Sequence, residues 1–220
     1  AGRAALAQSA PKAELGFRTF KWKVGGGDLA DELSLLDDVV AGLPPGSKLR
    51  LDANGAWDRR QAGRWLDRAA ERPVEFIEQP VARDARGAED VLRGLAGDFP
   101  TPIALDESLA GAGDVERWLA ADWPGIFVIK PALLGDPFPV MARLAAAKAD
   151  VVFSSALETA VGAKSSLQVA FAWRGKPRAL GFGVWPLFMA TVFDGPFGAA
   201  YIRSGDVKRL NPEAAWTALN

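Results

Sequence analysis

Short apolar runs of strand length alternate along the chain with longer amphipathic stretches of helical periodicity. The runs of strand length occupy residues 17–24, 48–52, 74–78, 103–106, 126–129, 151–154 and 179–182. Strands that are apolar throughout and separated by single helices are typical of parallel strands buried on both faces. The pattern therefore predicts an α/β protein with seven parallel strands.

Capping residues mark where several helices should begin. Asp28 precedes an amphipathic stretch that ends at Gly42, and Asp58 with Gln61 three residues later forms a capping-box pattern. Asp114 is predicted to head a third helix in the same way. No linker or low-complexity run divides the chain, so we expect a single domain over residues 1–220.

Polar residues recur where each of the first six strands ends. They are spaced 24 to 29 residues apart, about one strand-helix unit, and comprise Lys23, Asp52, Glu78, Asp106, Lys130 and Ser154. The carboxyl ends of the strands in a parallel barrel share one rim, which is its catalytic face. An open sheet would use residues from only two or three strands at one crevice. The regular spacing therefore favours a TIM-like barrel.

Composition narrows the chemistry that this rim could perform. The chain of 220 residues holds 26 Lys plus Arg against 27 Asp plus Glu, which predicts a small-molecule ligand and no nucleic-acid or membrane partner. It has no Cys and no His, which excludes disulfides, thiolate nucleophiles, His-ligated metals and His-based triads. Acid/base chemistry therefore falls to Lys, Asp, Glu or Tyr. The absence of Cys permits a reducing compartment, so we expect a cytoplasmic protein. No apolar run approaches the roughly 20 residues of a membrane span.

Three of the strand-end residues are carboxylates on consecutive strands: Asp52, Glu78 and Asp106. Brought together, they would repel one another unless a cation lay among them. Oxygen ligands of this kind suit Mg²⁺, with Mn²⁺ as a substitute. Each carboxylate taken alone could instead cap a helix or pair with a basic residue.

Lysines accompany the carboxylates. Lys21 and Lys23 lie two residues apart on one strand and so point to the same face, where the proximity of two ammonium groups should lower the pKa of at least one. They could also be surface lysines of an edge strand. Lys130 ends a strand farther along the chain. Lysines around a metal held by carboxylates can form and stabilise an enolate.

Five motifs resemble the strand-end signatures of the muconate-lactonizing branch of the enolase superfamily. They are Lys21-Trp22-Lys23 and the segments 51–55, 76–80, 104–108 and 129–131. Segments 20–25 and 154–159 are most similar to the o-succinylbenzoate synthases of menaquinone and phylloquinone biosynthesis. The resemblance extends from about residue 17 to residue 183 and implies the superfamily's (β/α) barrel.

The resemblance also implies a reaction. Such enzymes are lyases that dehydrate 2-succinyl-6-hydroxy-2,4-cyclohexadiene-1-carboxylate to o-succinylbenzoate by syn elimination through an enediolate. Lys23 would remove the α-proton and then protonate the departing hydroxyl, Lys130 would stabilise the enediolate, and Lys21 would assist. The implied Mg²⁺ ligands are Asp52, Glu78 and Asp106.

Five residues could contact the substrate: Arg50, Asn54, Ser154, Ser155 and Gly181. Arg50 points inward with Asp52 and could either meet a substrate carboxylate or pair with Glu78 or another acid. Asn54 could orient a metal ligand or simply form a turn before a glycine. The two serines and Gly181 could bind the succinyl carboxylate or serve only the turns between strands and helices.

The chain departs from the superfamily at its beginning, because only 16 residues precede Phe17. Superfamily members carry an N-terminal α+β capping domain and a first barrel strand before the Lys-x-Lys strand. We therefore expect a C-terminal-type barrel domain without its first strand and capping domain, and a longer complete gene product.

Three other functions fit part of the pattern. An N-acylamino-acid racemase or dipeptide epimerase would use the same lysines as paired acid/base catalysts. A Schiff-base aldolase would use Lys130 as its nucleophile. A non-catalytic barrel fragment would need none of these groups, although buried charges without a function should be lost.

Overall fold

A computed structural model describes residues 4–219 of the chain, which divide into two compact units. The first unit takes the chain up to Ser108 together with Trp123–Ile126, and the second comprises Leu109–Asp122 and Phe127 onward. The expectation of a single domain over residues 1–220 stays a prediction. Strands alternate with helices in both units, as predicted.

Four parallel strands form the sheet of the first unit. They are β1 (Thr19–Lys23), β2 (Lys48–Asp52), β3 (Val74–Glu78) and β4 (Ile103–Leu105), and they neighbour one another in chain order. The register pairs Lys23 with Asp52, and Asp52 with Glu78. Because side chains in register on parallel strands point to the same face, these three residues share one face at the carboxyl ends.

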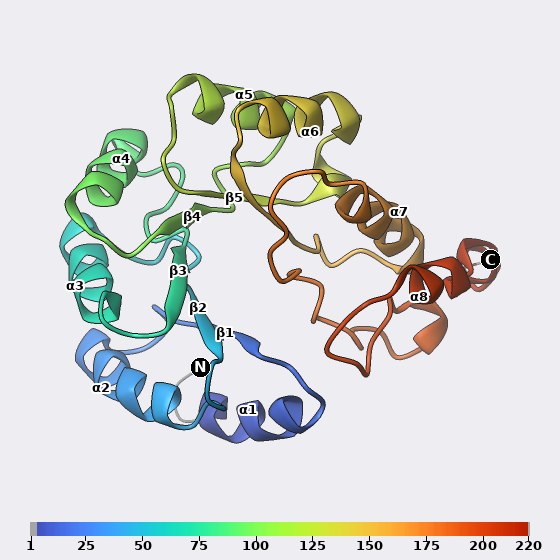
Figure 1. The fold of residues 1–220 in the computed structure, drawn as a ribbon, viewed down its shortest axis with the longest axis horizontal. Coiled ribbons are helices and arrows are strands. Elements are labelled where there is room, and N and C mark those ends of the chain that lie inside the picture. The colour runs from blue at the N-terminus through green and yellow to red at the C-terminus, as the bar shows by residue number, and fades with distance from the viewer. Residues whose placement is uncertain (1–3, 220) are drawn as a thin grey trace. The chain divides into compact units, whose positions relative to one another are not determined.

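The helices of this unit are α1 (Ala4–Glu14), α2 (Leu29–Ala41), α3 (Arg59–Ala69) and α4 (Ala88–Asp98). Helices α2, α3 and α4 lie along one side of strands β1 to β3 (Figure 1). The predicted helix starts are confirmed, because the Asp28 side chain accepts hydrogen bonds at the start of α2, and Asp58 and Gln61 form a capping box at the start of α3.

Three tryptophans form a buried cluster in the first unit. The rings of Trp57 and Trp65 are stacked with centroids 5.3 Å apart, and the edge of Trp22 meets Trp65 at 6.0 Å. All three are at most 5% exposed. Since side chains alternate along a strand, Trp22 anchors β1 on the face opposite Lys21 and Lys23.

The second unit holds β5 (Ile126–Ile129) except for its first residue, and the neighbouring parallel strand β6 (Asp150–Phe153). A hydrogen bond of 2.9 Å from the Ser154 amide to the Ile129 carbonyl continues their pairing. The remaining elements are α5 (Ala112–Ala120), η1 (Pro131–Leu133), α6 (Pro137–Ala146), α7 (Ala160–Phe171), η2 (Thr191–Phe193), α8 (Ser204–Arg209) and α9 (Pro212–Thr217).

The prediction of a seventh strand at residues 179–182 is wrong. Only Gly181 pairs there, in an isolated parallel bridge with Ser154 in which its amide donates to the Phe153 carbonyl at 2.7 Å. Glycine has low strand propensity, and Gly181 lies inside this four-residue run while Gly183 directly follows it. The run is therefore too short and too rich in glycine to extend the pairing beyond one bridge.

The helix expected to begin after Asp114 also begins elsewhere. Helix α5 starts at Ala112 with Gly111 as its capping residue, so Asp114 lies within the first turn. Its carboxylate accepts a 3.0 Å hydrogen bond from the backbone N–H of Ala110. The acidic side chain therefore still satisfies a backbone donor near the helix start, from inside the helix rather than before it.

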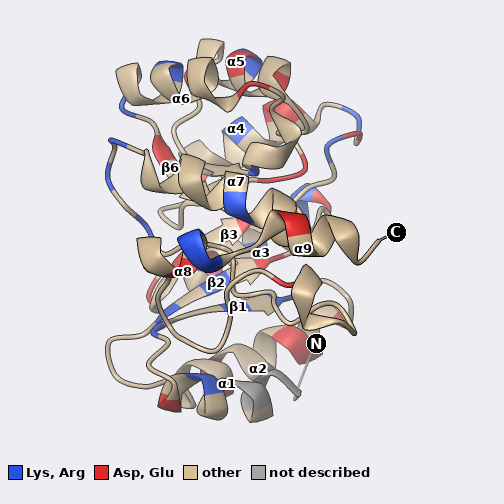
Figure 2. Ribbon diagram, turned by 90° about the vertical axis from the view of Figure 1, so that its right-hand side faces the viewer, with Lys and Arg blue, Asp and Glu red and all other residues tan. Residues whose placement is uncertain are grey.

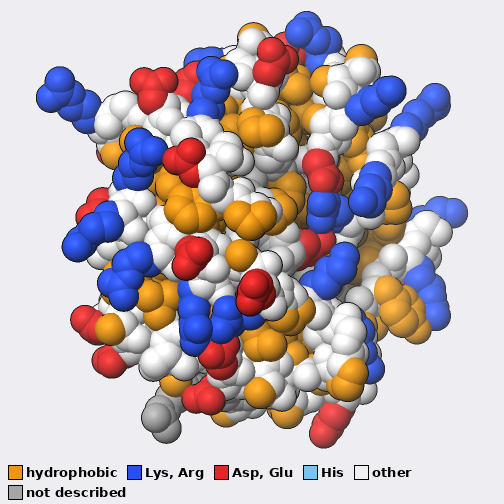
Figure 3. Space-filling model, turned by 60° about the vertical axis from the view of Figure 1, so that its left-hand side comes forward, with side chains coloured by type: hydrophobic (Ala, Val, Ile, Leu, Met, Phe, Trp, Pro, Cys, Tyr) orange, Lys and Arg blue, Asp and Glu red, His pale blue; other side chains and the backbone are white. Residues whose placement is uncertain are grey.

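The surface carries charges of both signs. Basic and acidic side chains are interspersed with apolar ones on the face drawn in Figure 3. Within residues 4–219, no helix combines the length and the apolar character needed to cross a bilayer.

Candidate functional site

Two lysines and two carboxylates meet at the carboxyl ends of β1, β2 and β3. The Nζ of Lys21 lies 3.0 Å from Oδ2 of Asp52 and 2.7 Å from Oε1 of Glu78. The Nζ of Lys23 lies 2.5 Å from the same Asp52 oxygen. The strand ends thus bring together four of the predicted site residues. Lys and Arg, drawn blue, and Asp and Glu, drawn red, are spread over the helices as well (Figure 2).

Burial and neighbouring charges set the protonation of the two carboxylates. Asp52 is fully buried and Glu78 is 1% exposed. Burial, with the charges of Asp52 and Asp106, raises the pKa of Glu78 to about 8 against the opposing effect of Lys21. Burial also acts to raise the pKa of Asp52, but Lys21 and Lys23 lower it by more, so that it lies below its usual range. The site therefore holds more negative charge than it readily tolerates.

The pKa of Lys21 is raised, in the direction opposite to that expected for a lysine beside another ammonium group. Burial acts to lower this pKa, but the charges of Glu78 and Asp52 and their hydrogen bonds raise it by more. The carboxylates on the adjacent strands outweigh any effect of the neighbouring ammonium group. Lys21 is therefore held as a cation here.

Asp106, the third predicted metal ligand, directly follows β4. It is 6% exposed, and its charge contributes to the raised pKa of Glu78. Across residues 4–219, no three His, Cys, Asp or Glu side chains converge closely enough to hold a metal ion. Lysine ammonium groups instead contact the oxygens of Asp52 and Glu78.

The chemistry of the three carboxylates nevertheless fits Mg²⁺. All three are buried and offer only oxygen, which hard cations prefer. Mutual repulsion among them contributes to the raised pKa of Glu78, and a cation between them would relieve it. Lys21 already bridges two of them as a positive charge. Asp52, Glu78 and Asp106 as a common ligand set stay a prediction.

Gln79 organises the site, and the sequence reasoning missed it. Its buried side-chain amide donates to the Val81 carbonyl and the Ser108 hydroxyl, each at 2.8 Å. Its carbonyl accepts from the backbone N–H of Asp106 at 3.0 Å and of Ser108 at 3.1 Å. Gln79 therefore fixes the chain that follows β4. The only signal in the sequence is a polar residue directly after Glu78.

Arg50 pairs with an acid, which is Glu75 rather than Glu78. Its Nε donates to Oε2 of Glu75 at 2.7 Å, and its guanidinium lies 4.9 Å from the centroid of the Phe76 ring. Both charged side chains are almost fully buried. The register between β2 and β3 shifts between Leu49 and Arg50, which leaves Glu75 beside Arg50. Contact between Arg50 and the substrate stays a prediction.

Asn54 both turns the chain and contacts the site. Its backbone is left-handed at φ 46°, and its N–H donates to Oδ1 of Asp52 at 3.1 Å. Its side-chain carbonyl accepts from Nζ of Lys23 at 2.7 Å, and its side-chain amide donates to Oε1 of Glu107 at 2.8 Å. The two interpretations offered by the sequence, a turn and the orientation of site residues, are therefore compatible.

The predicted residues of the second unit lie at its own strand ends. Lys130 follows β5 and caps η1. The Ser154 hydroxyl donates to the Gly181 carbonyl at 3.2 Å, and the Ser155 hydroxyl donates to Glu158 and accepts from the Leu157 N–H at 2.9 Å. These contacts stabilise turns. Binding of the succinyl carboxylate by the serines and Gly181, and stabilisation of the enediolate by Lys130, stay predictions.

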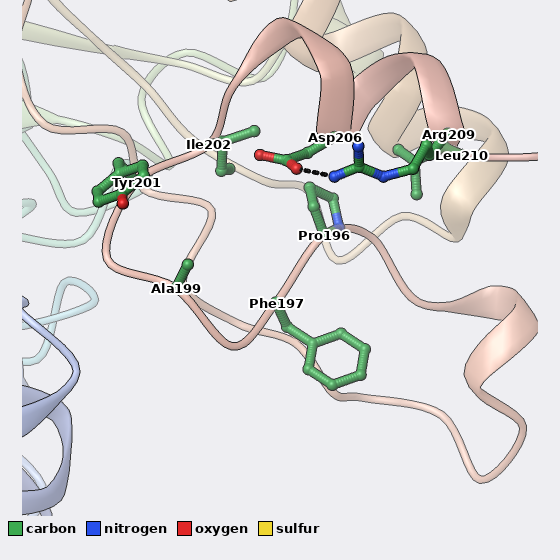
Figure 4. A pocket seen from close by; sticks show the side chains of 8 residues that line it. All are labelled: Pro196, Phe197, Ala199, Tyr201, Ile202, Asp206, Arg209 and Leu210. Carbon is green, nitrogen blue, oxygen red and sulfur yellow. Dashed lines mark hydrogen bonds and ion pairs between the residues drawn. The ribbon is translucent and has the colours of Figure 1, made fainter.

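A pocket in the second unit contains none of the predicted site residues. Phe197, Tyr201, Asp206 and Arg209 are among the eight residues that line it (Figure 4). Asp206 and Arg209 pair with each other across its wall. The pocket therefore offers no lysine or surplus carboxylate for the predicted chemistry.

Known proteins resemble this chain over most of its length. The family model described as "Enolase C-terminal domain-like" matches residues 3–201. The o-succinylbenzoate synthase of Thermosynechococcus vestitus is 45% identical over 188 residues, which cover 83% of this chain and 57% of that protein. The o-succinylbenzoate synthase of Thermobifida fusca is 32% identical over 219 residues, which cover 94% of this chain and 67% of that protein.

Solved structures show the same similarity. The crystal structure of o-succinylbenzoate synthase from Thermosynechococcus elongatus BP-1, complexed with Mg in the active site, has a TM-score of 0.76 and 43% identity. The match covers 83% of this chain and 57% of that one. Muconate lactonizing enzyme from Pseudomonas putida has a TM-score of 0.69 at 27% identity, over 77% of this chain and 47% of that one. These matches confirm the predicted barrel class, and the chain spans little more than half the length of several of these relatives.

Proposed function

The chain belongs to the enolase C-terminal domain-like family, and from this premise we propose that it is the barrel part of a Mg²⁺-dependent o-succinylbenzoate synthase. The reaction would be dehydration of 2-succinyl-6-hydroxy-2,4-cyclohexadiene-1-carboxylate, in menaquinone or phylloquinone biosynthesis. One observation carries the proposal: Lys21 and Lys23 reach the buried carboxylates of Asp52 and Glu78 in a chain 45% identical to such a synthase.

Asp52, Glu78 and Asp106 would hold the metal. When bound, Mg²⁺, or Mn²⁺ in its place, would hold the substrate carboxylate and stabilise the negative charge that develops on it. The protein contributes buried oxygen donors on consecutive strands, whose position the sheet register fixes. Gln79 keeps the chain around Asp106 in place through its hydrogen bond to the Asp106 amide.

Lys23 would perform both proton transfers. As a neutral amine it takes the proton from the carbon that bears the carboxylate, and the C–H electron pair moves into the carboxylate to give an enediolate. The resulting ammonium then donates this proton to the hydroxyl on the adjacent carbon. The C–O bond breaks, water leaves, and the electron pair returns to form the double bond of the aromatic ring. A single base on one face makes the elimination syn.

The other two lysines would act by charge. Lys21, hydrogen-bonded to both Asp52 and Glu78, would assist Lys23 and help to balance the carboxylates. Lys130 would stabilise the enediolate. A racemase or epimerase would use Lys23 and Lys130 as an acid/base pair, but the relatives described above that share most with this chain are synthases.

Replacing the base tests the proposal. In the full-length protein with Mg²⁺, Lys23→Ala should lower kcat about 10³-fold, because a positioned general base contributes on that scale. Turnover is followed by loss of the cyclohexadiene absorbance and appearance of the aromatic product. Lys208→Ala, a substitution of an exposed lysine on α8, is the matched control.

Two outcomes would contradict the mechanism. Turnover of Lys23→Ala near the wild-type level would show that Lys23 is not the base. Activity that survives a chelator, together with borohydride trapping of a carbonyl substrate, would instead indicate Schiff-base chemistry. Exchange of the α-proton of N-acyl amino acids with solvent deuterium, without dehydration, would identify a racemase.

A further inference from the structure

We propose that Glu107 is a positioning residue for Lys23 and that it acts through the side-chain amide of Asn54. The inference deepens the proposed function and depends on it, because it concerns the same base. Glu107 lies outside the predicted carboxylate set of Asp52, Glu78 and Asp106.

Three side chains form a continuous series of hydrogen bonds. Oε1 of Glu107 accepts from Nδ2 of Asn54 at 2.8 Å, and Oδ1 of Asn54 accepts from Nζ of Lys23 at 2.7 Å. They come from three separate segments: the end of β1, the turn after β2 and the chain that follows β4. The series therefore links the general base to a carboxylate that it does not itself contact.

The charges at the two ends fix the orientation of the Asn54 amide. An ammonium group only donates hydrogen bonds, and an ionised carboxylate only accepts them. With Lys23 as an ammonium group, the amide carbonyl faces Lys23 and its NH₂ faces Glu107, because the flipped amide would place like partial charges together at both ends. When Lys23 is the neutral base, the Glu107 carboxylate alone maintains this orientation. Glu107 thus holds the acceptor oxygen toward the base.

Lys23 needs this restraint because its exposed side chain has many accessible rotamers. The side chain is 58% exposed, and its flexible four-carbon stem gives it many rotamers. Asp52, which also contacts Lys23, is shared with Lys21 and is a proposed metal ligand. Asn54 is the partner of Lys23 that lies outside this carboxylate set, so the position of the base depends on it most when the carboxylates are occupied.

Glu107 is itself well placed to hold Asn54. Its neighbours Asp106 and Ser108 are fixed by Gln79, and its backbone carbonyl accepts from Nη1 of Arg83 at 3.2 Å. Its second carboxylate oxygen, Oε2, is buried and accepts no hydrogen bond from any residue that the structure describes. Such burial costs folding free energy, which points to a role other than stability.

The test removes the charge of Glu107 and keeps its shape. In the full-length protein with Mg²⁺, we expect Glu107→Gln to lower kcat about tenfold while KM stays unchanged. Losses of this size are typical when a hydrogen-bond partner of a directly acting residue is removed. Glu71→Gln, at an exposed glutamate of the same unit, is the matched control. With substrate deuterated at the α-carbon, the kinetic isotope effect on kcat should rise in Glu107→Gln, because proton abstraction becomes more rate-limiting.

The isotope effect separates positioning from a structural role. A smaller folded fraction would lower kcat and leave the isotope effect at its wild-type value, and that result would overturn the proposal. A kcat within about twofold of wild type would also overturn it, because substitutions that do not interact with the site cause deviations of that size. In an Asn54→Leu background, Glu107→Gln should lower kcat no further, because the hydrogen bonds that link Glu107 to Lys23 are already lost. A second full loss there would show that Glu107 acts by another route.

A measurement without substrate separates this inference from the proposed function. The side-chain NH₂ resonances of Asn54, assigned by NMR, should move in Glu107→Gln and stay in place in Glu71→Gln. If the wild-type protein does not dehydrate the cyclohexadiene substrate, the proposed function fails. The NMR measurement still tests the hydrogen bond between Glu107 and Asn54, because it needs no substrate. If the resonances do not move, the connection is absent even in an active synthase.

Discussion

Strands β1 to β3 carry two charged clusters, one at each end, and they differ in charge balance. The cluster at the carboxyl ends brings Lys21 and Lys23 against Asp52 and Glu78, with Asp106 near enough to affect the pKa of Glu78. At the amino ends, Glu75 pairs with Arg50 at 2.7 Å and lies 3.8 Å from Lys48.

The two clusters differ in the balance between carboxylates and cationic side chains. In the cluster at the amino ends, two cations surround one carboxylate, and the Arg50 guanidinium also lies over the Phe76 ring. In the cluster at the carboxyl ends, two ammonium groups contact two carboxylates, the negative charge of Asp106 also acts on Glu78, and the pKa of Glu78 is raised to about 8. A buried charge alone therefore does not mark a site. A surplus of negative charge does, because it favours an added cation.

The largest expected effect is at the cluster with surplus charge. Asp52→Asn should lower kcat by roughly 10³-fold, because losing one metal ligand removes several kcal/mol of stabilisation of the transition state. The fold should persist, because Lys21 keeps its hydrogen bond to Glu78 and Lys23 keeps its hydrogen bond to Asn54. Turnover at saturating Mg²⁺ measures the loss of kcat. Calorimetry measures the loss of Mg²⁺ affinity that should accompany it. Unchanged Mg²⁺ affinity would remove Asp52 from the ligand set.

The next effect is on stability and concerns the cluster at the amino ends. Glu75→Leu should lower the free energy of unfolding by about 3 kcal/mol, because it leaves the Arg50 charge buried without its carboxylate. Urea unfolding measures this change, and kcat per folded molecule should not fall. Adding Arg50→Met should recover most of the loss, because an apolar pair tolerates burial. If the double variant is no more stable than Glu75→Leu, the two residues do not act as a pair.

The smallest effect is expected at a partly exposed pair in the second unit. Nε of Arg178 donates to Oδ1 of Asp150 at 2.5 Å, and this hydrogen bond holds the pKa of Asp150 below its usual range against the effect of burial. A depressed pKa contributes stability above the unfolded pKa of about 3.9, and that contribution is lost as the pH falls through the folded value. Asp150→Asn should therefore cost at most about 1 kcal/mol at neutral pH.

Urea unfolding of Asp150→Asn and wild type at several pH values checks this sign. The two curves should converge as the pH falls below about 4, where the wild-type carboxyl becomes protonated. A difference that grows on acidification would show that Asp150 contributes in some other way.

Much of the first unit could be predicted because its determinants are local. Asp28, Asp58 and Gln61 cap helices through bonds to residues two or three positions away, so their spacing is sufficient. The contacts of Lys21 and Lys23 with Asp52 follow once the strands are parallel and in register. The pattern of strand ends therefore predicted the contacts of Lys21 and Lys23 with the carboxylates of β2 and β3, whereas the meeting of the other strand-end residues stays a prediction.

The rest depends on geometry that spacing does not encode. The shift of register between Leu49 and Arg50 places Glu75, and not Glu78, beside Arg50. Gln79 adopts a left-handed backbone at φ 38°, which turns its side chain toward the residues after β4. The role of Glu107 likewise depends on a contact across 53 positions of the chain. No periodic pattern reports such contacts.

The tryptophan cluster gives the acid/base face an intrinsic optical reporter. Trp22 alternates with Lys21 and Lys23 on the five residues of β1, and its indole meets the stacked pair of Trp57 and Trp65. A displacement of the lysines along this strand would also move one chromophore against two others. The exciton signal of coupled indoles in circular dichroism would then register the position of Lys21 and Lys23 before any substrate is converted.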